Sequence, residues 1–476
     1  MTLHTQRATL CILCINTHSP LENPHGRNPP VFVEMWTIPC GQFFALFPLC
    51  GNPRNLSTTP VDAPRPLPQG FPTLFHNILY YEYYFYLLSS PLLKNERSTK
   101  GREPTPMKFS CEKALLQSAI ATTARAVSPK SSIPALEGIL VEAGDQLRLT
   151  GYNLETGIRT VVPAQIDREG SLVLSARLFG EIIRKLPDDV VSFSADGYMV
   201  NITCGMSKFN ILATDPEDFP DLPAVEDQNS FSISRDKLGS MIRQTIFAVS
   251  DNESRPIHTG SLFEVSADGL TMVSVDGYRL ALRHESILEK DGALSFSFVV
   301  PGSALSEVEK ICGDSQDEAL VIEGDRHVMF RMGDTMLVSR RLEGEFLAYR
   351  QAIPRNNAIK VEGDTRTLLT SIDRVSLIIS DKLKSPLRCV FGDNVLSITT
   401  KTGIGDAADQ CPISGDGQNL EIGFNNRYLM DALKAAPTDR VRLELSSGVA
   451  PCVILPAEGE ENFLYMVLPV RLKAGE

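Results

Sequence analysis

The sequence predicts an α+β protein in which one domain plan, two helices packed on antiparallel sheets, occurs three times. The main evidence is an internal repeat of strand pairs, at 138–142 with 147–149, at 260–264 with 270–272, and at 386–390 with 396–398. Equivalent segments lie 122 to 126 residues apart, so three copies fill the 370 residues from Met107 onward. Self-similarity at a fixed spacing is the signature of repeated structural units.

Each copy is predicted to contain two amphipathic helices. From Leu238, apolar side chains recur at the i, i+3, i+4, i+7 spacing that places them on one face of a helix. This periodicity and the repeat predict six helices, at 112–126, 176–186, 235–247, 302–311, 365–378 and 426–435. Ser175, Ser234 and Asn425 precede three of them and are expected to act as N-caps. We expect the apolar faces to form the core.

Further strands complete each copy. Val328, Phe330 and Met332 alternate with polar residues, and 441–445 shows the same pattern, which is typical of a sheet with one buried face. Opening strands are predicted at 108–111, 230–234 and 358–362. The resulting domain boundaries are 107–228, 229–352 and 353–476.

Residues 1–106 differ in composition from the repeats. They contain 15 of the 31 prolines and the only tryptophan, and they show neither helical nor strand periodicity. Charged residues and prolines interrupt two apolar stretches, 31–50 and 71–93, which argues against membrane spans. Cys11-x-x-Cys14 lacks the second pair that a zinc site needs, and early prolines count against a targeting peptide. We expect a non-homologous N-terminal extension, either disordered or a product of an over-extended translation start.

The composition of the whole chain excludes several classes of protein. A hydrophobic fraction of 43% and a charged fraction of 22% are ordinary for a globular chain and exclude collagen and coiled coils. Ten cysteines in 476 residues are too few for a disulfide scaffold. The formal net charge of −12 argues against a protein that binds nucleic acid with its whole surface.

Patterns typical of catalysis are absent from the sequence. It has no phosphate-binding G-x-x-x-x-G-K-[ST] loop and no H-E-x-x-H motif, and the repeats contain only three histidines, His258, His284 and His327. The six cysteines of the repeats are widely spaced and read better as small buried apolar residues. We therefore predict no catalytic residue, no metal site and no cofactor.

The six predicted helices are unusually basic. They carry thirteen basic and seven acidic residues, whereas the 370 residues of the repeats have a net charge of −14. If the helices share one side of the assembly, that side attracts phosphate groups while the sheets repel them. Arg177, Arg184 and Arg243 are the candidate DNA-binding residues on these helices.

Four segments resemble the bacterial DNA polymerase III beta subunit family, the beta sliding clamps. They are 107–109, 275–280, 422–425 and 465–472, with the sequences Met-Lys-Phe, Val-Asp-Gly-Tyr-Arg-Leu, Ile-Gly-Phe-Asn and Tyr-Met-Val-Leu-Pro-Val-Arg-Leu. The resemblance covers the chain from Met107 to about Leu472. It implies the DNA clamp fold, a head-to-tail homodimeric ring of six similar domains whose twelve helices line a hole around duplex DNA.

The resemblance also implies a function. Such a ring is a processivity factor without catalytic activity of its own: it encircles double-stranded DNA and tethers the replicative polymerase, which raises the polymerase concentration at the primer end. DNA-directed DNA polymerase activity and 3′-5′ exonuclease activity then belong to the complete complex. The implied partners are the DNA polymerase III catalytic subunit, an ATP-dependent clamp loader and other proteins with a clamp-binding motif, all in the cytoplasm and away from any membrane.

Residues that match family positions suggest three sites. The partner-peptide cleft is implied at His258, Gly277, Tyr278, Arg279, Leu280, Leu347, Tyr428, Met466, Leu468, Pro469, Val470 and Arg471. Further DNA contacts are implied at Lys130, Asn252 and Arg255. The dimer interface is implied at Lys208 and Phe209 of the first domain and at Leu377 and Ile378 of the third.

Two other function classes remain open from the sequence. A monomeric DNA-binding scaffold of repeated domains would bind linear DNA without depending on its free ends. An enzyme of unknown type would show turnover and a cluster of acids with perturbed pKa values in a cleft. The oligomeric state distinguishes the ring from the scaffold most directly.

Overall fold

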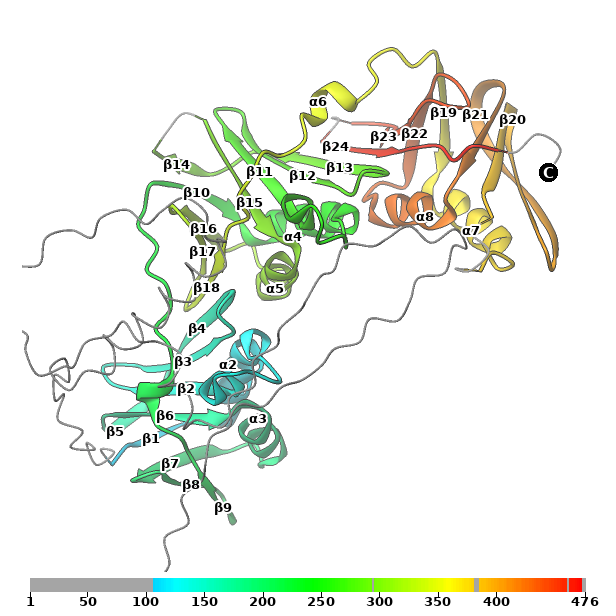
Figure 1. Ribbon diagram of the computed structural model, residues 1–476. Helices are drawn as coiled ribbons and strands as arrows, with labels where there is room; N and C mark the ends of the chain where they lie inside the picture. The colour runs from blue at the N-terminus through cyan, green and yellow to red at the C-terminus, as the bar shows by residue number, and fades with distance from the viewer. Residues whose placement is uncertain (1–105, 293–294, 381–384, 460–461, 473–476) are drawn as a thin grey trace, which may run out of the picture. The chain divides into compact units, whose positions relative to one another are not determined.

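The computed structural model describes residues 106–292, 295–380, 385–459 and 462–472 (Figure 1). These residues belong to one compact unit, Lys100–Glu476. The predictions for the N-terminal extension, its apolar stretches and its Cys11/Cys14 pair fall outside the described residues.

The first repeat contains two helices, each preceded by a strand. Its elements are β1 (Lys108–Glu112), α2 (Lys113–Thr123), β2 (Gly138–Ala143), β3 (Leu147–Tyr152), β4 (Thr156–Val162), β5 (Gln165–Arg168), β6 (Gly170–Ser175), α3 (Ala176–Lys185), β7 (Val190–Asp196), β8 (Met199–Cys204) and β9 (Ser207–Leu212).

The second repeat has the same order of elements. They are β10 (Asn229–Ser234), α4 (Arg235–Thr245), β11 (Gly260–Ser266), β12 (Gly269–Val275), β13 (Arg279–Glu285), β14 (Glu289–Asp291), β15 (Phe296–Pro301), α5 (Gly302–Cys312), β16 (Glu318–Glu323), β17 (His327–Met332) and β18 (Thr335–Arg340). A short helix, α6 (Tyr349–Ala352), lies between the second and third repeats.

The third repeat differs in its first half. Its elements are β19 (Ile359–Asp364), α7 (Thr365–Ser376), β20 (Leu387–Thr402), β21 (Gly405–Phe424), α8 (Asn426–Ala435), β22 (Arg440–Leu445), β23 (Cys452–Pro456) and β24 (Phe463–Val467). The separate strands predicted at 386–390 and 396–398 are one long strand, β20, with irregular register around Asp393. All six predicted helices are present within three residues of their predicted ends.

Antiparallel strand pairing joins the three repeats edge to edge. The sheets have five strands (β5-β1-β7-β8-β9), nine strands (β14-β10-β16-β17-β18-β4-β3-β2-β6) and ten strands (β15-β11-β12-β13-β24-β23-β22-β19-β21-β20). The nine-stranded sheet passes from the second repeat into the first through β18 and β4. The ten-stranded sheet passes from the second repeat into the third through β13 and β24. The sequence repeat did not predict this continuity.

The two junctions between repeats have the same register. Ser339 of β18 lies opposite Thr156 of β4, and Val467 of β24 lies opposite Arg279 of β13. The paired residues differ by 128 positions on one side and 123 on the other, which is close to the spacing of the repeat itself. One arrangement of two strand edges therefore occurs twice in the chain.

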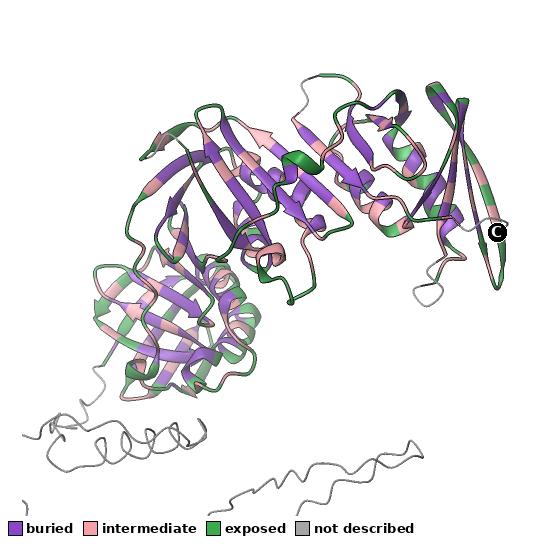
Figure 2. Cartoon of the chain, turned by 45° about the horizontal axis from the view of Figure 1, so that its top comes forward, coloured by how far each residue is buried: buried purple, intermediate pink, exposed green. Residues whose placement is uncertain are grey.

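Each repeat has its own hydrophobic core, made of the buried segments coloured purple in Figure 2. Each junction also places side chains of one repeat in the core of the next. Ala126 and Ile158 of the first repeat are buried in the core of the second. Ala248 and Ala281 of the second repeat are buried in the core of the third. Because these apolar atoms are removed from water at the junctions, the repeats stabilise one another.

The helix caps follow the prediction only in part. The Asn425 side chain accepts a hydrogen bond from the Arg427 backbone N–H, as expected. Ser175 and Ser234 occupy N-cap positions, but their side chains make no capping hydrogen bond, so this prediction is wrong for both. The nearby Ser234 hydroxyl instead lowers the pKa of the Asp236 carboxyl group.

The close packing at the start of β11 gives a stability prediction. A Cβ at Gly260 would lie 2.3 Å from the Val300 carbonyl oxygen, and backbone atoms there cannot move aside cheaply. We expect Gly260→Ala to lower the free energy of unfolding by about 1–3 kcal/mol, measured from urea unfolding curves. Gly144→Ala is the control, because its Cβ would meet no atom within 4 Å. Equal effects of the two substitutions would contradict the prediction.

Candidate functional site

A largely buried arginine, with 11% of its side chain exposed, holds the junction between the second and third repeats. The Arg279 Nε donates to Asp276 Oδ2 at 2.9 Å, and Nη1 donates to Asp431 Oδ2 of α8 at 2.6 Å. Its guanidinium lies over the Tyr428 ring, 4.6 Å from the centroid, and 5.4 Å from that of Phe247. Two carboxylates and two aromatic faces compensate for the desolvation of this charge.

The turn before Arg279 sets the position of Tyr278. Asp276 Oδ1 accepts the backbone N–H groups of Tyr278 and Arg279 at 2.8 and 2.9 Å. Gly277 has a φ of 91°, a conformation that residues with a side chain rarely adopt. Tyr278 consequently projects outward with 61% of its surface exposed, and its ring stacks against Tyr428 at 5.9 Å.

The chain after β24 crosses this junction as an extended segment. The Leu468 N–H donates to the Tyr278 carbonyl at 2.9 Å, and the Val470 N–H donates to the Gly423 carbonyl at 2.8 Å. A Cβ at Gly423 would lie 2.5 Å from the Val470 oxygen, so this close approach needs glycine. Pro469 lies between the two anchored residues and Arg471 follows them, half-buried and exposed respectively.

A pocket of about 690 Å³ lies beside this segment. Tyr428, Val470, Met430, Phe424 and Leu377 contribute its apolar lining. Such a volume is suited to a few bulky side chains of a ligand. Next to it, Leu280 and Met466 are buried in a small hydrophobic cluster of their own.

His258 and Leu347 reach the same region through Phe346. The His258 ring contacts the Phe346 ring edge to face at 5.6 Å, and Phe346 packs on the cluster that contains Leu280 and Met466. Burial and the neighbouring Arg255 lower the pKa of His258, so the ring is neutral near pH 7. Leu347 is exposed next to Phe346. The predicted cleft residues therefore all lie at or beside the second junction.

Several residues of this junction escaped the sequence prediction. Asp276, Asp431 and Phe247 hold Arg279, and Phe346 connects His258 to the hydrophobic cluster. Asp276 stands inside the motif at 275–280, which was a usable signal. Asp431 and Phe247 come from distant segments, and no local pattern marks them.

The predicted DNA-binding residues lie on exposed helices and loops. Arg177 and Arg184 are exposed on α3, and Lys130, Asn252 and Arg255 are exposed in loops. Arg243 on α4 pairs with Glu309 of α5 at 2.8 Å, so its charge is partly neutralised.

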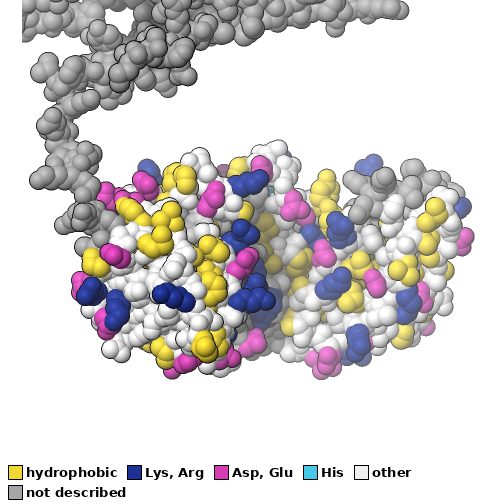
Figure 3. Space-filling view, turned by 90° about the horizontal axis from the view of Figure 1, so that it is seen from below, with side chains coloured by type: hydrophobic (Ala, Val, Ile, Leu, Met, Phe, Trp, Pro, Cys, Tyr) yellow, Lys and Arg dark blue, Asp and Glu magenta, His cyan; other side chains and the backbone are white. Residues whose placement is uncertain are grey.

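Positive and negative side chains alternate on the face of the molecule drawn in Figure 3. There, Lys and Arg side chains lie among Asp and Glu side chains. On this face, attraction of DNA would depend on individual basic side chains.

The predicted dimer-interface residues lie at the edges of the first and third repeats. Lys208 and Phe209 are exposed on β9, the last strand of the five-stranded sheet. Leu377, at the end of α7, has 81% of its surface exposed, and the adjacent Ile378 is half-buried.

Two features are absent from the described part of the chain. Within it, no helix combines the length and the apolar character needed to cross a membrane. The same residues contain no group of three or more His, Cys, Asp or Glu side chains arranged to hold a metal ion.

Comparisons with known proteins match this part of the chain throughout. Three family profiles of the DNA polymerase III beta subunit match in order: the N-terminal domain at residues 107–223, the central domain at 232–347 and the C-terminal domain at 350–471. The chain is 31% identical over 377 residues to the beta sliding clamp of Staphylococcus aureus, an alignment that covers 77% of this chain and 99% of the relative.

Solved structures give the same result. The DNA polymerase sliding clamp of Bacillus subtilis is 30% identical with a TM-score of 0.73, and the match covers 78% of this chain and all of that one. The sliding clamp of Pseudomonas aeruginosa bound to griselimycin is 26% identical, also with a TM-score of 0.73, over 77% of this chain and all of that one.

Proposed function

The chain belongs to the DNA polymerase III beta subunit family, and we propose that it acts as a DNA sliding clamp, a closed ring of two copies that encircles duplex DNA and tethers a DNA polymerase. One observation carries this proposal: the two junctions inside the chain pair strands in the same way. Within the described residues, the first and the third repeat each keep an unpaired strand edge, and these two edges together would make a third junction of the same kind. We propose domain boundaries at 107–228, 229–352 and 353–476, and no catalytic role for the chain itself.

The open strand edges have the positions that a third junction needs. By the repeat spacing, β9 corresponds to β18 and β24, and residues 405–411 of β21 correspond to β4 and β13. An exposed edge strand with apolar side chains invites pairing with another chain. We propose that β9 of one copy pairs with 405–411 of the second, with Ser207 opposite Asp409 and Ile211 opposite Gly405.

Side chains support the same pairing. At the second junction, Phe247 packs on Tyr465, with their ring centroids 5.3 Å apart. The repeat equivalents of these two residues are Leu377 and Phe209, which lie at the two open edges. Likewise, Ala248 and Ala281, which enter the core of the third repeat, correspond to Ile378 and Ala407. We propose that these two residues enter the first-repeat core of the other copy.

A head-to-tail contact of this kind joins two different surfaces. It yields a closed ring when the rotations that relate successive copies add up to a full turn. Two copies would supply six domains and twelve helices. A ring needs no base contacts, because it holds DNA topologically. The polymerase would bind through a short peptide with bulky apolar side chains in the cleft at Tyr278, Tyr428, Leu468 and Val470. A loader protein would open the ring, in the cytoplasm where chromosomal DNA is copied.

The interface prediction is that Phe209→Ala combined with Leu377→Ala gives monomers. Loss of two buried apolar side chains from one interface costs on the order of 3–6 kcal/mol of association free energy per interface. Sedimentation equilibrium measures the change. The matched control is Leu288→Ala with Val449→Ala, which removes two apolar side chains that are exposed elsewhere. A double variant that stays dimeric would place Phe209 and Leu377 outside the interface, and a monomeric unmodified chain would favour the DNA-binding scaffold.

The cleft prediction concerns Tyr278→Ala and Leu468→Ala. Each substitution should weaken the binding of a peptide from the DNA polymerase III catalytic subunit by about 1–3 kcal/mol, because each removes apolar contact area from the cleft. Isothermal titration calorimetry measures the affinity, and thermal melts establish that the variants are folded. Leu288→Ala is the control. Unchanged affinity in both folded variants would rule out this cleft as the peptide site.

The DNA prediction concerns the exposed basic residues of the first repeat. Arg177→Glu with Arg184→Glu should weaken loading on circular DNA and flatten its dependence on salt, because each lost phosphate contact reduces the slope of log affinity against log salt by about 0.9. Arg168→Glu with Arg331→Glu is the control, since these arginines are exposed on strands. The proposed orientation of α3 toward DNA fails if both variants change loading equally.

A further inference from the structure

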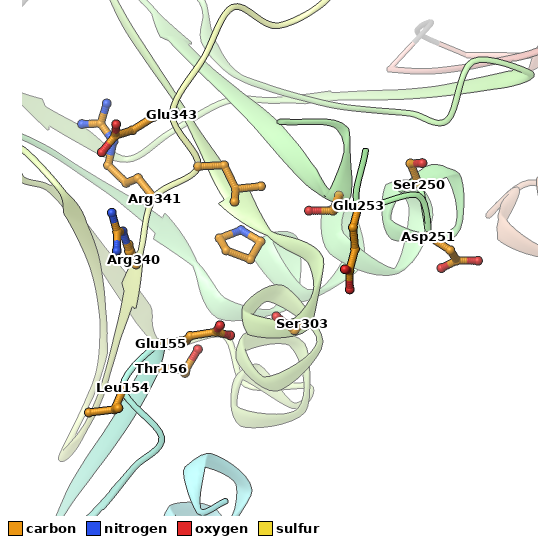
Figure 4. A pocket seen from close by; sticks show the side chains of 13 residues that line it. Leu154, Glu155, Thr156, Ser250, Asp251, Glu253, Ser303, Arg340, Arg341 and Glu343 are labelled. Carbon is orange, nitrogen blue, oxygen red and sulfur yellow. The ribbon is translucent and has the colours of Figure 1, made fainter. Parts of the chain in front are cut away.

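A second pocket lies at the junction between the first and second repeats. It has a volume of about 640 Å³ and draws its lining from four segments: the turn at 154–156, the loop at 250–259, the start of α5 at 301–303 and the chain at 340–343 at the end of β18 (Figure 4). We propose that this pocket, which we call the first-junction pocket, docks an extended basic segment of a partner protein.

The backbone of the first-junction pocket repeats that of the cleft at the second junction. The Arg340 N–H donates to the Glu155 carbonyl at 3.0 Å, as the Leu468 N–H does to Tyr278 at 2.9 Å. The Leu342 N–H donates to the Val299 carbonyl at 2.9 Å, matching Val470 and Gly423 at 2.8 Å. The same chain path therefore forms a cavity at both junctions.

The turn that shapes the pocket is also held in the same conformation. Leu154 has a φ of 75°, where its equivalent Gly277 has 91°. Leu154 is half-exposed, and together with Pro301 and Leu342 it gives the pocket an apolar surface. These three side chains suit the aliphatic portion of a docked segment.

The polar side chains differ from those of the cleft, and they determine the class of ligand. Glu155 stands at the position of Tyr278, Arg340 at that of Leu468, and Glu343 at that of Arg471. Figure 4 shows Glu155, Ser303 and Glu253 around one space, although they come from three separate segments. The same structural position is therefore lined by aromatic and aliphatic side chains at the second junction and by charged side chains at the first.

The charges in the first-junction pocket are unbalanced. Arg341 is bound by Glu323 Oε1 and by the Gly324 carbonyl, both at 2.7 Å, so it is neutralised by a group outside the pocket lining. Among the side chains that line the pocket, that leaves Glu155, Asp251, Glu253 and Glu343 against Arg340, and none of these four carboxylates has an ion pair within the described residues. Arg255 lies on the same loop as Asp251 and Glu253 but is exposed outside the lining. This excess of negative charge inside the pocket favours Lys or Arg side chains of a ligand.

The proposal is tested with a fluorescein-labelled peptide of sequence Lys-Leu-Lys-Leu-Lys and a twin with Glu in place of Lys. We expect the basic peptide to bind the full chain, measured by fluorescence anisotropy, and the acidic twin not to bind. Glu155→Gln with Glu253→Gln and Glu343→Gln should weaken binding about tenfold, because each exposed charge pair contributes a factor of about two to five.

Two controls distinguish binding in the first-junction pocket from binding elsewhere on the surface. Glu169→Gln with Glu289→Gln and Glu318→Gln removes the same charge from exposed positions outside the pocket and should change affinity less than about twofold. Tyr278→Ala should leave binding unchanged, since it alters only the cleft. The proposal is overturned if both triple variants lose affinity equally, if Tyr278→Ala removes binding, if the acidic twin binds better, or if the basic peptide does not bind. None of these measurements depends on DNA or on ring formation.

Discussion

The edge-to-edge pairing of strands between repeats is the interaction on which the rest of the structure depends. β18 pairs with β4, and β13 pairs with β24, so the backbone donors and acceptors of four strand edges are satisfied inside the chain. The same pairing brings Ala126 and Ile158 into one neighbouring core, and Ala248 and Ala281 into another. Since exposed edges are prone to uncontrolled association, a chain of such repeats either leaves two edges open or closes on a further copy.

The electrostatic contacts at the second junction differ from those at the first. Arg279 is held by Asp276 and Asp431, which belong to different repeats, and it stacks on Tyr428. Thr156 occupies the equivalent position at the first junction, where the two repeats are joined instead by an ion pair between Arg125 Nη1 and Glu307 Oε2 at 3.3 Å. A buried ion pair is a poor source of net stability, but it requires a fixed geometry to compensate for its desolvation. Arg279 therefore fixes the relative position of β13 and α8, between which the aromatic cleft lies.

The fold and the site were predictable wherever their signals are local in the sequence. Apolar periodicity located all six helices, and the contiguous motif at 275–280 contains the whole turn that positions Tyr278. The long strand β20 was predicted as two strands because the sequence around Asp393 is typical of a turn. In the structure the strand continues there, with shifts in its register. Asp431 and Phe247 come from distant segments and meet the turn only through strand pairing. No single-sequence pattern encodes such contacts, and the continuity of the sheets across the junctions was missed for the same reason.

Equivalent backbone hydrogen bonds anchor the crossing segment at each junction, and this explains how one chain path presents different chemistry. Arg340 and Leu468 donate equivalent N–H groups to Glu155 and Tyr278, and none of these four side chains is needed for that contact. At the third, open edge the equivalent of Tyr278 is Ile404, which is also exposed. An aromatic, an acidic and an aliphatic residue thus occupy one structural position. Because the backbone contact does not depend on this side chain, the position carries a different chemistry in each repeat.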